Sequence, residues 1–90
     1  MTDFIMTMEE KIYSQLQKDL SPTQLEVINE SALHAGHAGD DGSGQSHFRI
    51  IIQSEALNQF NRIQRHRRIH DILKHEMPFI HALSIDFLPG

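Results

Sequence analysis

Histidine is the residue type in this chain with the widest scope for chemistry. Seven histidines occur among 90 residues and cysteine is absent, so imidazoles are the available soft-metal ligands and thiolate chemistry is excluded. His34 and His37 lie three residues apart in a glycine-rich stretch, and His81 lies at the entry of a predicted strand. Two histidines cannot complete a tetrahedral metal site, so such a site would need donors from another molecule. The simpler interpretation is that the loop histidines are solvated and that His81 packs beside the core.

Most of the positive charge lies in residues 62–74, where a helical wheel separates two faces. The core stripe is formed by Ile69, Ile72 and Leu73. The opposite face and its flanks hold Arg67, Arg68, His70, Asp71, Lys74 and His75. Arg65 points along the apolar stripe, with His66 at its border. We therefore expect Arg65 either to extend its guanidinium to solvent or to bind a specific acceptor, such as a carboxylate or a row of carbonyls.

The exposed basic face is compatible with phosphate contact or with a solubilising helix surface. The net charge is −4: residues 1–45 hold two lysines and eight acids (−6), and residues 46–90 hold six basic residues and four acids (+2). Asp71 interrupts the basic patch, and aromatic residues that would stack on bases are scarce there. These features favour the solubilising surface.

Hydrolytic chemistry has little support in the sequence. Ser46 and His47 are adjacent, but neighbours in a strand point to opposite faces, which predicts that they do not form a catalytic pair. A nucleophile elbow is absent, and the glycine-rich stretch lacks the lysine of a phosphate-binding loop. We expect a protein that is not an enzyme.

Hydrophobic periodicity predicts the elements that position these residues. A capping box at Thr7–Glu10 begins a helix that ends before Ser21-Pro22. Strands are predicted over residues 25–29, 47–53 and 80–87, a flexible loop over 32–46, and helical segments over 54–60 and 61–76. The order α-β-β-α-α-β predicts a single α+β domain over residues 1–90, with a three-stranded mixed sheet and helices on one face.

Composition limits the cellular setting. Apolar runs in the chain are shorter than the roughly 18–20 residues that cross a bilayer, so no membrane span is predicted. The first residues carry acids and lack the apolar stretch of a signal peptide. Together with the absence of cysteine, these features predict a cytoplasmic protein.

The order and spacing of several motifs resemble the BolA family. The motifs are Leu25-Glu26-Val27, Asn29-Glu30-Ser31, His34, Ser46-His47-Phe48, Arg65-His66-Arg67, Ile69, Leu73, Glu76 and His81-Ala82-Leu83. They extend over nearly the whole chain, and their combined spacing is more specific than any one motif. The resemblance implies a class II KH-like α+β fold, in agreement with the element order above.

The resemblance also implies a role as the partner of a monothiol glutaredoxin. The family's loop histidine and the histidine before Ala-Leu help to hold a bridging [2Fe–2S] cluster, and they correspond to His34 and His81. The glutaredoxin cysteine and glutathione would supply the other ligands, so the isolated chain is expected to hold no cluster. Mixed nitrogen and sulfur ligation raises the cluster potential above that of all-thiolate ligation. We expect iron–sulfur trafficking or iron and redox signalling, partner contacts around His81 and residues 65–68, and a monomer or weak homodimer without the cluster.

The same family is described as DNA-binding transcriptional regulators of stress and morphology, which gives an alternative function for residues 54–75. The expected partner or nucleic-acid contacts are Arg65, His66, Arg67, Arg68 and Lys74. The Gly-x-x-Gly motif with which KH domains clamp RNA is absent, because no glycine lies between Gly44 and Gly90. His37 matches no family position, and its role stays open.

Overall fold

Helices, short strands and 3-10 segments alternate along the chain in the computed structural model, which describes residues 6–31 and 46–89. In chain order they are α1 (Met8–Leu20), β1 (Gln24–Asn29), β2 (His47–Gln53), η2 (Glu55–Leu57), α2 (Arg62–Ile72), η3 (Met77–Phe79) and β3 (Ala82–Phe87). The predicted α+β class and element order are confirmed. The architecture is compatible with the class II KH-like arrangement that the resemblance implies.

Helix α1 begins and ends where the local sequence predicts. Thr7 Oγ1 accepts a hydrogen bond from the Glu10 backbone at 3.2 Å, and Glu10 Oε1 accepts one from the Thr7 backbone at 3.0 Å. These two bonds form the predicted capping box. At the other end Ser21 adopts a left-handed conformation with φ of 42°, and Pro22 follows it.

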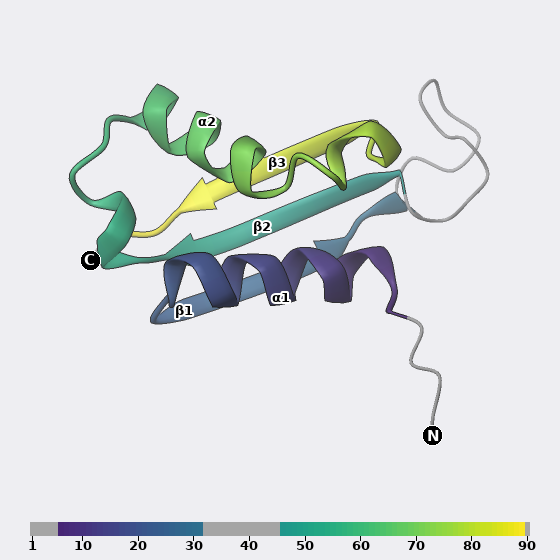
Figure 1. Ribbon diagram of the computed structural model, residues 1–90, viewed down its shortest axis with the longest axis horizontal. Coiled ribbons are helices and arrows are strands. Elements are labelled where there is room, and N and C mark those ends of the chain that lie inside the picture. Colours follow the sequence, from purple (N-terminus) through teal and green to yellow (C-terminus); the bar gives the residue numbers. More distant parts are fainter. Residues whose placement is uncertain (1–5, 32–45, 90) are drawn as a thin grey trace.

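Strand β2 lies at the centre of the sheet, antiparallel to β1 and parallel to β3. Because parallel strands begin at the same edge and an antiparallel neighbour ends there, the end of β1 and the starts of β2 and β3 meet at one edge (Figure 1). Ser31, Ser46 and His81 flank these strand ends. The predicted loop over residues 32–46 lies outside the described residues, apart from Ser46.

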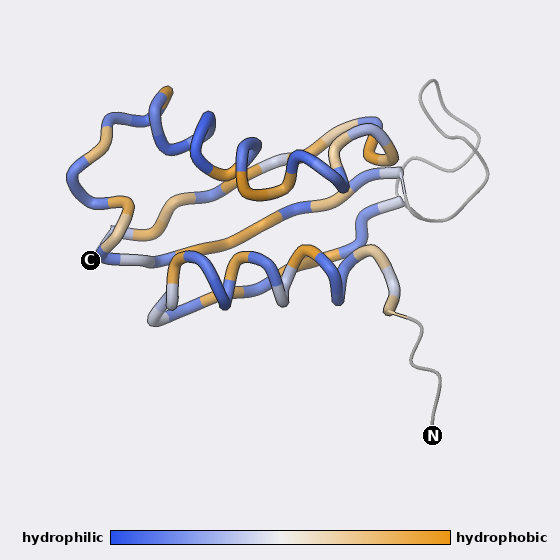
Figure 2. The backbone as a smooth tube through the Cα atoms, viewed as in Figure 1, coloured by the Kyte–Doolittle hydropathy of each residue, from blue (hydrophilic) through white to orange (hydrophobic). Residues whose placement is uncertain are grey.

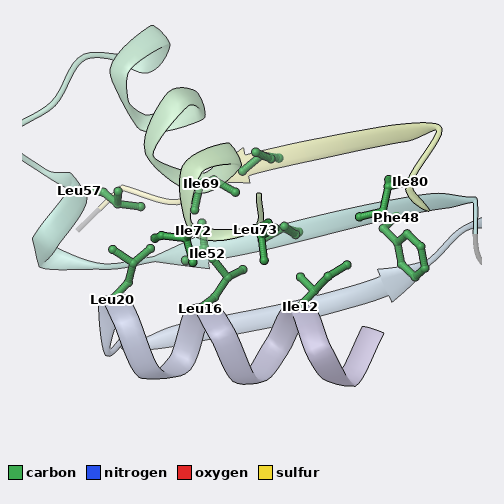
Figure 3. Close-up of a cluster of buried hydrophobic side chains, with 12 residues drawn as sticks. Ile12, Leu16, Leu20, Phe48, Ile52, Leu57, Ile69, Ile72, Leu73 and Ile80 are labelled. Carbon is green, nitrogen blue, oxygen red and sulfur yellow. The ribbon is translucent and has the colours of Figure 1, made fainter. Parts of the chain in front are cut away.

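Both long helices cover the same face of the sheet. Figure 2 shows hydrophobic residues recurring along α1 and running along β2, and Figure 3 shows that they meet between the layers. The buried apolar residues are Ile12, Leu16, Leu20, Phe48, Ile50, Ile52, Leu57, Ile69, Ile72, Leu73, Ile80 and Ile85. On the opposite face Arg49 joins the end of β1 to β3, since its guanidinium donates to Glu30, the residue after β1, at 3.0 Å and to Asp86 of β3 at 2.9 Å. No helix within residues 6–31 and 46–89 has the length and apolar character needed to cross a membrane.

Three predicted boundaries in the second half of the chain are wrong. The helical segment predicted over residues 54–60 is only the 3-10 turn η2, Glu55–Leu57. Helix α2 ends at Ile72 rather than near Glu76, because the chain tightens into turns in which the Glu76 backbone donates to the Leu73 carbonyl at 2.8 Å. The third strand begins at Ala82 rather than Ile80. The Ile80 backbone N–H closes the η3 turn by donating to Met77 at 3.1 Å, so it is not available to a sheet.

Candidate functional site

His81 lies at the sheet edge where β2 and β3 begin, and its side chain is exposed. Its backbone N–H donates to the Ser46 carbonyl at 2.8 Å, which fixes the chain just before β3. The imidazole lies beside that of His47, with ring centres 5.3 Å apart and planes inclined by 48°. His81 is therefore an anchored residue whose ring can be reached from outside the molecule.

The buried hydroxyl of Ser31 ties the two chain segments on either side of residues 32–45. Ser31 Oγ accepts hydrogen bonds from the backbone N–H groups of Ser46 at 2.9 Å and His47 at 3.1 Å, and it donates to the His47 carbonyl at 3.4 Å. Two backbone donors at this edge are thereby satisfied although both residues are buried. Ser31 and Ser46, which flank residues 32–45, are thus held together beside His81.

Ser46 and His47 interact directly, so the prediction that they point apart is wrong. Ser46 Oγ and His47 Nδ1 share a hydrogen bond of 2.7 Å, whose donor depends on the imidazole tautomer. Strand alternation does not apply to Ser46, because it lies before the first residue of β2. Ser46 is 0% exposed and His47 is 6% exposed. A nucleophilic hydroxyl must reach its substrate, so this buried pair is a structural element that orients the His47 ring.

The glycine-rich stretch holds the other predicted ligand, His34, and also His37, whose role stays open. His34 and His37 lie outside the described residues. In the part of the chain that the structure describes, no group of three or more histidine, aspartate or glutamate side chains is arranged to hold a metal ion. A metal centre built on His81 therefore needs donors beyond the described residues.

Of the two alternatives expected for Arg65, the structure shows the one in which its guanidinium binds specific acceptors. Its Nε donates to the Phe60 carbonyl at 2.8 Å, and its terminal nitrogen donates to the Asn58 carbonyl at 3.4 Å. The guanidinium carbon also lies 5.8 Å from the centre of the Phe87 ring, within reach of a cation–π interaction. Arg65 thus fastens the start of α2 to the turn before it and to the end of β3.

His66 occupies the border position that the helical wheel predicts. Its half-buried ring meets Phe87 edge-on, with centres 5.2 Å apart. Burial lowers the pKa of the His66 imidazole below its usual value, and the neighbouring Arg62 and His70 lower it further. At neutral pH this ring is therefore uncharged.

The remaining basic residues of this segment face solvent. Arg67, Arg68 and Lys74 are exposed, as the helical wheel predicts. Arg68 lies 3.9 Å from Asp71, an exposed pair that contributes little to stability. These side chains are available to a partner, with Asp71 reducing the local positive charge.

Arg65 and His66 do not lie beside His81. They contact Phe87, the last residue of β3, whereas His81 precedes the first. An extended segment from residue 81 to residue 87 spans about 20 Å. The single contact surface expected around His81 and residues 65–68 is therefore two separate surfaces (Figure 1). The first, the histidine edge, lies at the start of β3 and contains His81, His47 and the serines that bind them. The second, the basic helix face, lies on α2 and begins near the end of β3.

Sequence reasoning missed His47 and Ser31 as components of the histidine edge. Both belong to the motifs quoted above, but their roles depend on hydrogen bonds between segments far apart in the chain. The detectable signal was the pair of serines that bracket residues 32–45, since serine at a strand end commonly binds backbone groups.

Comparison with known proteins identifies relatives over nearly the whole chain. A family model described as "BolA-like protein" matches residues 16–89. An uncharacterized protein of Sinorhizobium sp is 45% identical over 83 residues, covering 90% of this chain and 89% of its own. The DNA-binding transcriptional regulator BolA of Haemophilus influenzae is 35% identical, covering 89% of this chain and 75% of its own.

The fold agrees with these matches. The solved BolA domain of SufE1 from Arabidopsis thaliana is 35% identical and superposes with a TM-score of 0.81, covering 93% of each chain. Other relatives are longer: the chain spans 22% of SufE-like protein 1 and 49% of Protein BOLA1 from the same plant. The names of the family and of the bacterial regulator describe BolA-like proteins and a regulator rather than an enzyme. Sequence, fold and motif spacing therefore agree that this chain belongs to the BolA-like protein family.

Proposed function

We propose that this protein is a non-enzymatic partner of a monothiol glutaredoxin and shares a bridging [2Fe–2S] cluster with it. In this role His81 is the anchored ligand and His34 the second one, while the glutaredoxin cysteine and glutathione supply the sulfur ligands. The cluster serves iron–sulfur trafficking or iron and redox signalling.

The exposure of His81 at a rigid edge is the observation that carries this proposal. A ligand to a cluster held by another molecule has to be accessible, yet its backbone must be fixed so that binding orders few additional groups. His81 meets both conditions, because its side chain is exposed while its N–H is bound to Ser46. The buried His47 ring beside it limits the orientations that the His81 ring can take.

The chain length between Ser31 and His34 supports the choice of the second ligand. His34 follows Ser31 by three residues in the sequence. Ser31 is hydrogen-bonded to Ser46, which in turn binds the His81 backbone. The second proposed ligand therefore follows closely in sequence on a residue that is hydrogen-bonded to the segment holding His81.

The ligand chemistry also fits a shared cluster. The chain has no cysteine, and the described residues offer no complete metal site of their own. Neutral imidazoles bind iron well and are compatible with thiolates on the same cluster. Sulfur ligands from a second molecule would therefore complete what this chain lacks.

The test mixes the apo protein with a cluster-loaded monothiol glutaredoxin and glutathione, and follows visible absorption and circular dichroism. We expect the wild-type protein to change both spectra and His81→Ala or His34→Ala to alter or abolish that change. His75→Ala is the matched control, because His75 is exposed and lies outside both proposed ligand positions. Unchanged spectra with wild type, or wild-type spectra with the His34→Ala, His81→Ala double variant, would refute the proposal.

A DNA-binding regulator is the second candidate, favoured by the name of the Haemophilus influenzae relative and by the exposed cations of α2 and the turn after it. Phosphate contacts release counterions, so binding should weaken steeply with salt, and Arg67→Ala, Arg68→Ala or Lys74→Ala should each reduce the salt dependence. A mobility-shift titration at several salt concentrations measures this. Absence of any shift at low salt would eliminate this candidate.

A further inference from the structure

His66 and His70 form a second histidine pair, on successive turns of α2. Their ring centres are 6.5 Å apart and their planes are inclined by 58°. Both rings line a surface hollow of about 350 Å³ together with Arg62, Ile63 and Arg67. None of the roles described above uses these two imidazoles as a pair.

We propose that His66 and His70 bind a divalent late-transition-metal ion of the zinc, nickel and copper class. Residues four apart lie on one face of a helix, and two histidines at this spacing are a recurring way to chelate zinc. Imidazole nitrogen is also a donor that zinc, nickel and copper prefer over magnesium and calcium. Two protein ligands leave the remaining coordination positions to water or to an anion.

The observed ring geometry is close to what one metal ion requires. A zinc–nitrogen bond is about 2.0–2.1 Å, so two imidazoles on one ion have ring centres roughly 4.5–5.3 Å apart. The observed separation of 6.5 Å has to shorten by about 1–2 Å. His70 is exposed and can supply this movement by a small side-chain rotation, while His66 stays packed against Phe87.

Two arginine charges in the hollow affect the binding of a metal ion and of an anion in opposite directions. Arg62 and Arg67 line the same hollow, and their charges disfavour a bare dication while favouring an anion that completes its coordination. Screening these charges with salt should therefore strengthen metal binding at this pair. Dications held loosely by the acidic surface of a chain with net charge −4 would instead be released by salt.

The proposed site is distinct from the histidine edge. His66 lies against Phe87, at the far end of β3 from His81. Metal at the His66–His70 pair therefore requires neither the glutaredoxin nor the cluster, and its test does not depend on the proposed function.

The experiment adds Ni²⁺ to the full-length protein and maps paramagnetic broadening of backbone amide signals, with Zn²⁺ affinity measured by calorimetry. We expect broadening centred on α2, and Zn²⁺ binding to this site at least about tenfold weaker in His70→Gln, because loss of one ligand removes the chelate advantage. His66→Gln should have the same effect. His75→Gln is the control, because it replaces an exposed histidine close to α2 that is not part of the pair. It should leave both the broadening and the Zn²⁺ affinity unchanged. Mg²⁺ should not compete.

Two results would overturn the proposal. One is that α2 signals stay sharp at saturating Ni²⁺, or broaden equally in wild type and His70→Gln. The other is that Zn²⁺ binding weakens when NaCl rises from about 0.05 to 0.3 M, the sign of adventitious surface binding. His70 is exposed, so His70→Gln should fold normally, and unchanged amide signals outside α2 verify this.

Discussion

The rings of His47 and His81 contact each other at the edge where β2 and β3 begin, with one imidazole buried and the other exposed. The register of the parallel strands places His47 opposite Ala82, which brings the neighbouring His81 to the buried ring. Ser46 Oγ holds the His47 ring at 2.7 Å. The accessible histidine of the proposed cluster site is therefore supported by a buried one whose orientation is already fixed.

Ser31→Ala should destabilise the histidine edge. The substitution removes the acceptor of two backbone N–H groups, those of Ser46 and His47, in a buried setting. We expect the free energy of unfolding to fall by about 1–3 kcal/mol. Urea denaturation followed by circular dichroism measures the loss. Ser14→Ala, at an exposed position of α1, is the control; an equal effect of the two substitutions would contradict the role of Ser31.

Two isoleucines of α2, one buried and one exposed, test which face of this helix packs against the sheet. Ile69 is 0% exposed and belongs to the core, whereas Ile63 is 65% exposed. We expect Ile69→Ala to lower the free energy of unfolding by about 2–5 kcal/mol. Ile63→Ala should change it by no more than about 0.5 kcal/mol. Similar losses for both variants in chemical denaturation would show that the helix faces the sheet differently.

Replacing Arg65 should lower the stability of the fold more than replacing the exposed Arg67 does. Arg65→Ala removes two hydrogen bonds to carbonyls and the contact with Phe87, so we expect a loss of about 1–2 kcal/mol. Arg65→Lys should not restore it, because an ammonium cannot reproduce the planar set of donors. The exposed Arg67→Ala is the control in the same thermal denaturation series. Stability restored by lysine would argue that only the charge is needed.

The capping box of α1 predicts a specific pH dependence. Hydrogen bonds from the Thr7 backbone and hydroxyl lower the pKa of the Glu10 carboxyl below 4.5 in the folded state. The ionised Glu10 carboxylate therefore contributes its full stabilisation of the folded state above pH 4.5. As the pH falls, Glu10 takes up its proton in the unfolded chain first. The contribution is lost as the pH falls through the lowered folded-state pKa. Tm measured from pH 6 downward should show that the difference between wild type and Glu10→Gln shrinks in acid. A Tm difference between wild type and Glu10→Gln that grows in acid would contradict this prediction. Glu9→Gln is the control, because it removes a neighbouring carboxylate that is not part of the capping box.

Several features of the fold were predictable because neighbours in sequence decide them. The Thr7–Glu10 capping box and the alternation that defines β2 depend on residues within a few positions of one another. The buried stripe containing Ile69 follows from helical periodicity in the same way. The helical wheel placed the charge of Arg65 on the apolar stripe, which predicted that its guanidinium either extends to solvent or binds a specific acceptor. The acceptors themselves became evident only from the turn that precedes the helix.

The structure decided what the sequence left open or predicted wrongly. The end of α2 at Ile72 depends on turns that direct the chain into β3, which local propensity does not register. The Ser46–His47 hydrogen bond arises because Ser46 lies just outside the strand, where alternation gives no guidance.

The sequence by itself determined the family, the element order and the residue types available for chemistry, because these follow from motif spacing and local periodicity. Only the tertiary structure decided that His81 lies beside His47 and about 20 Å along β3 from the contacts of Arg65 and His66. The physical reason is that strand register and helix packing are set by burial of the whole core. Side chains far apart in sequence are brought together, or kept apart, by that packing and not by their own chemistry.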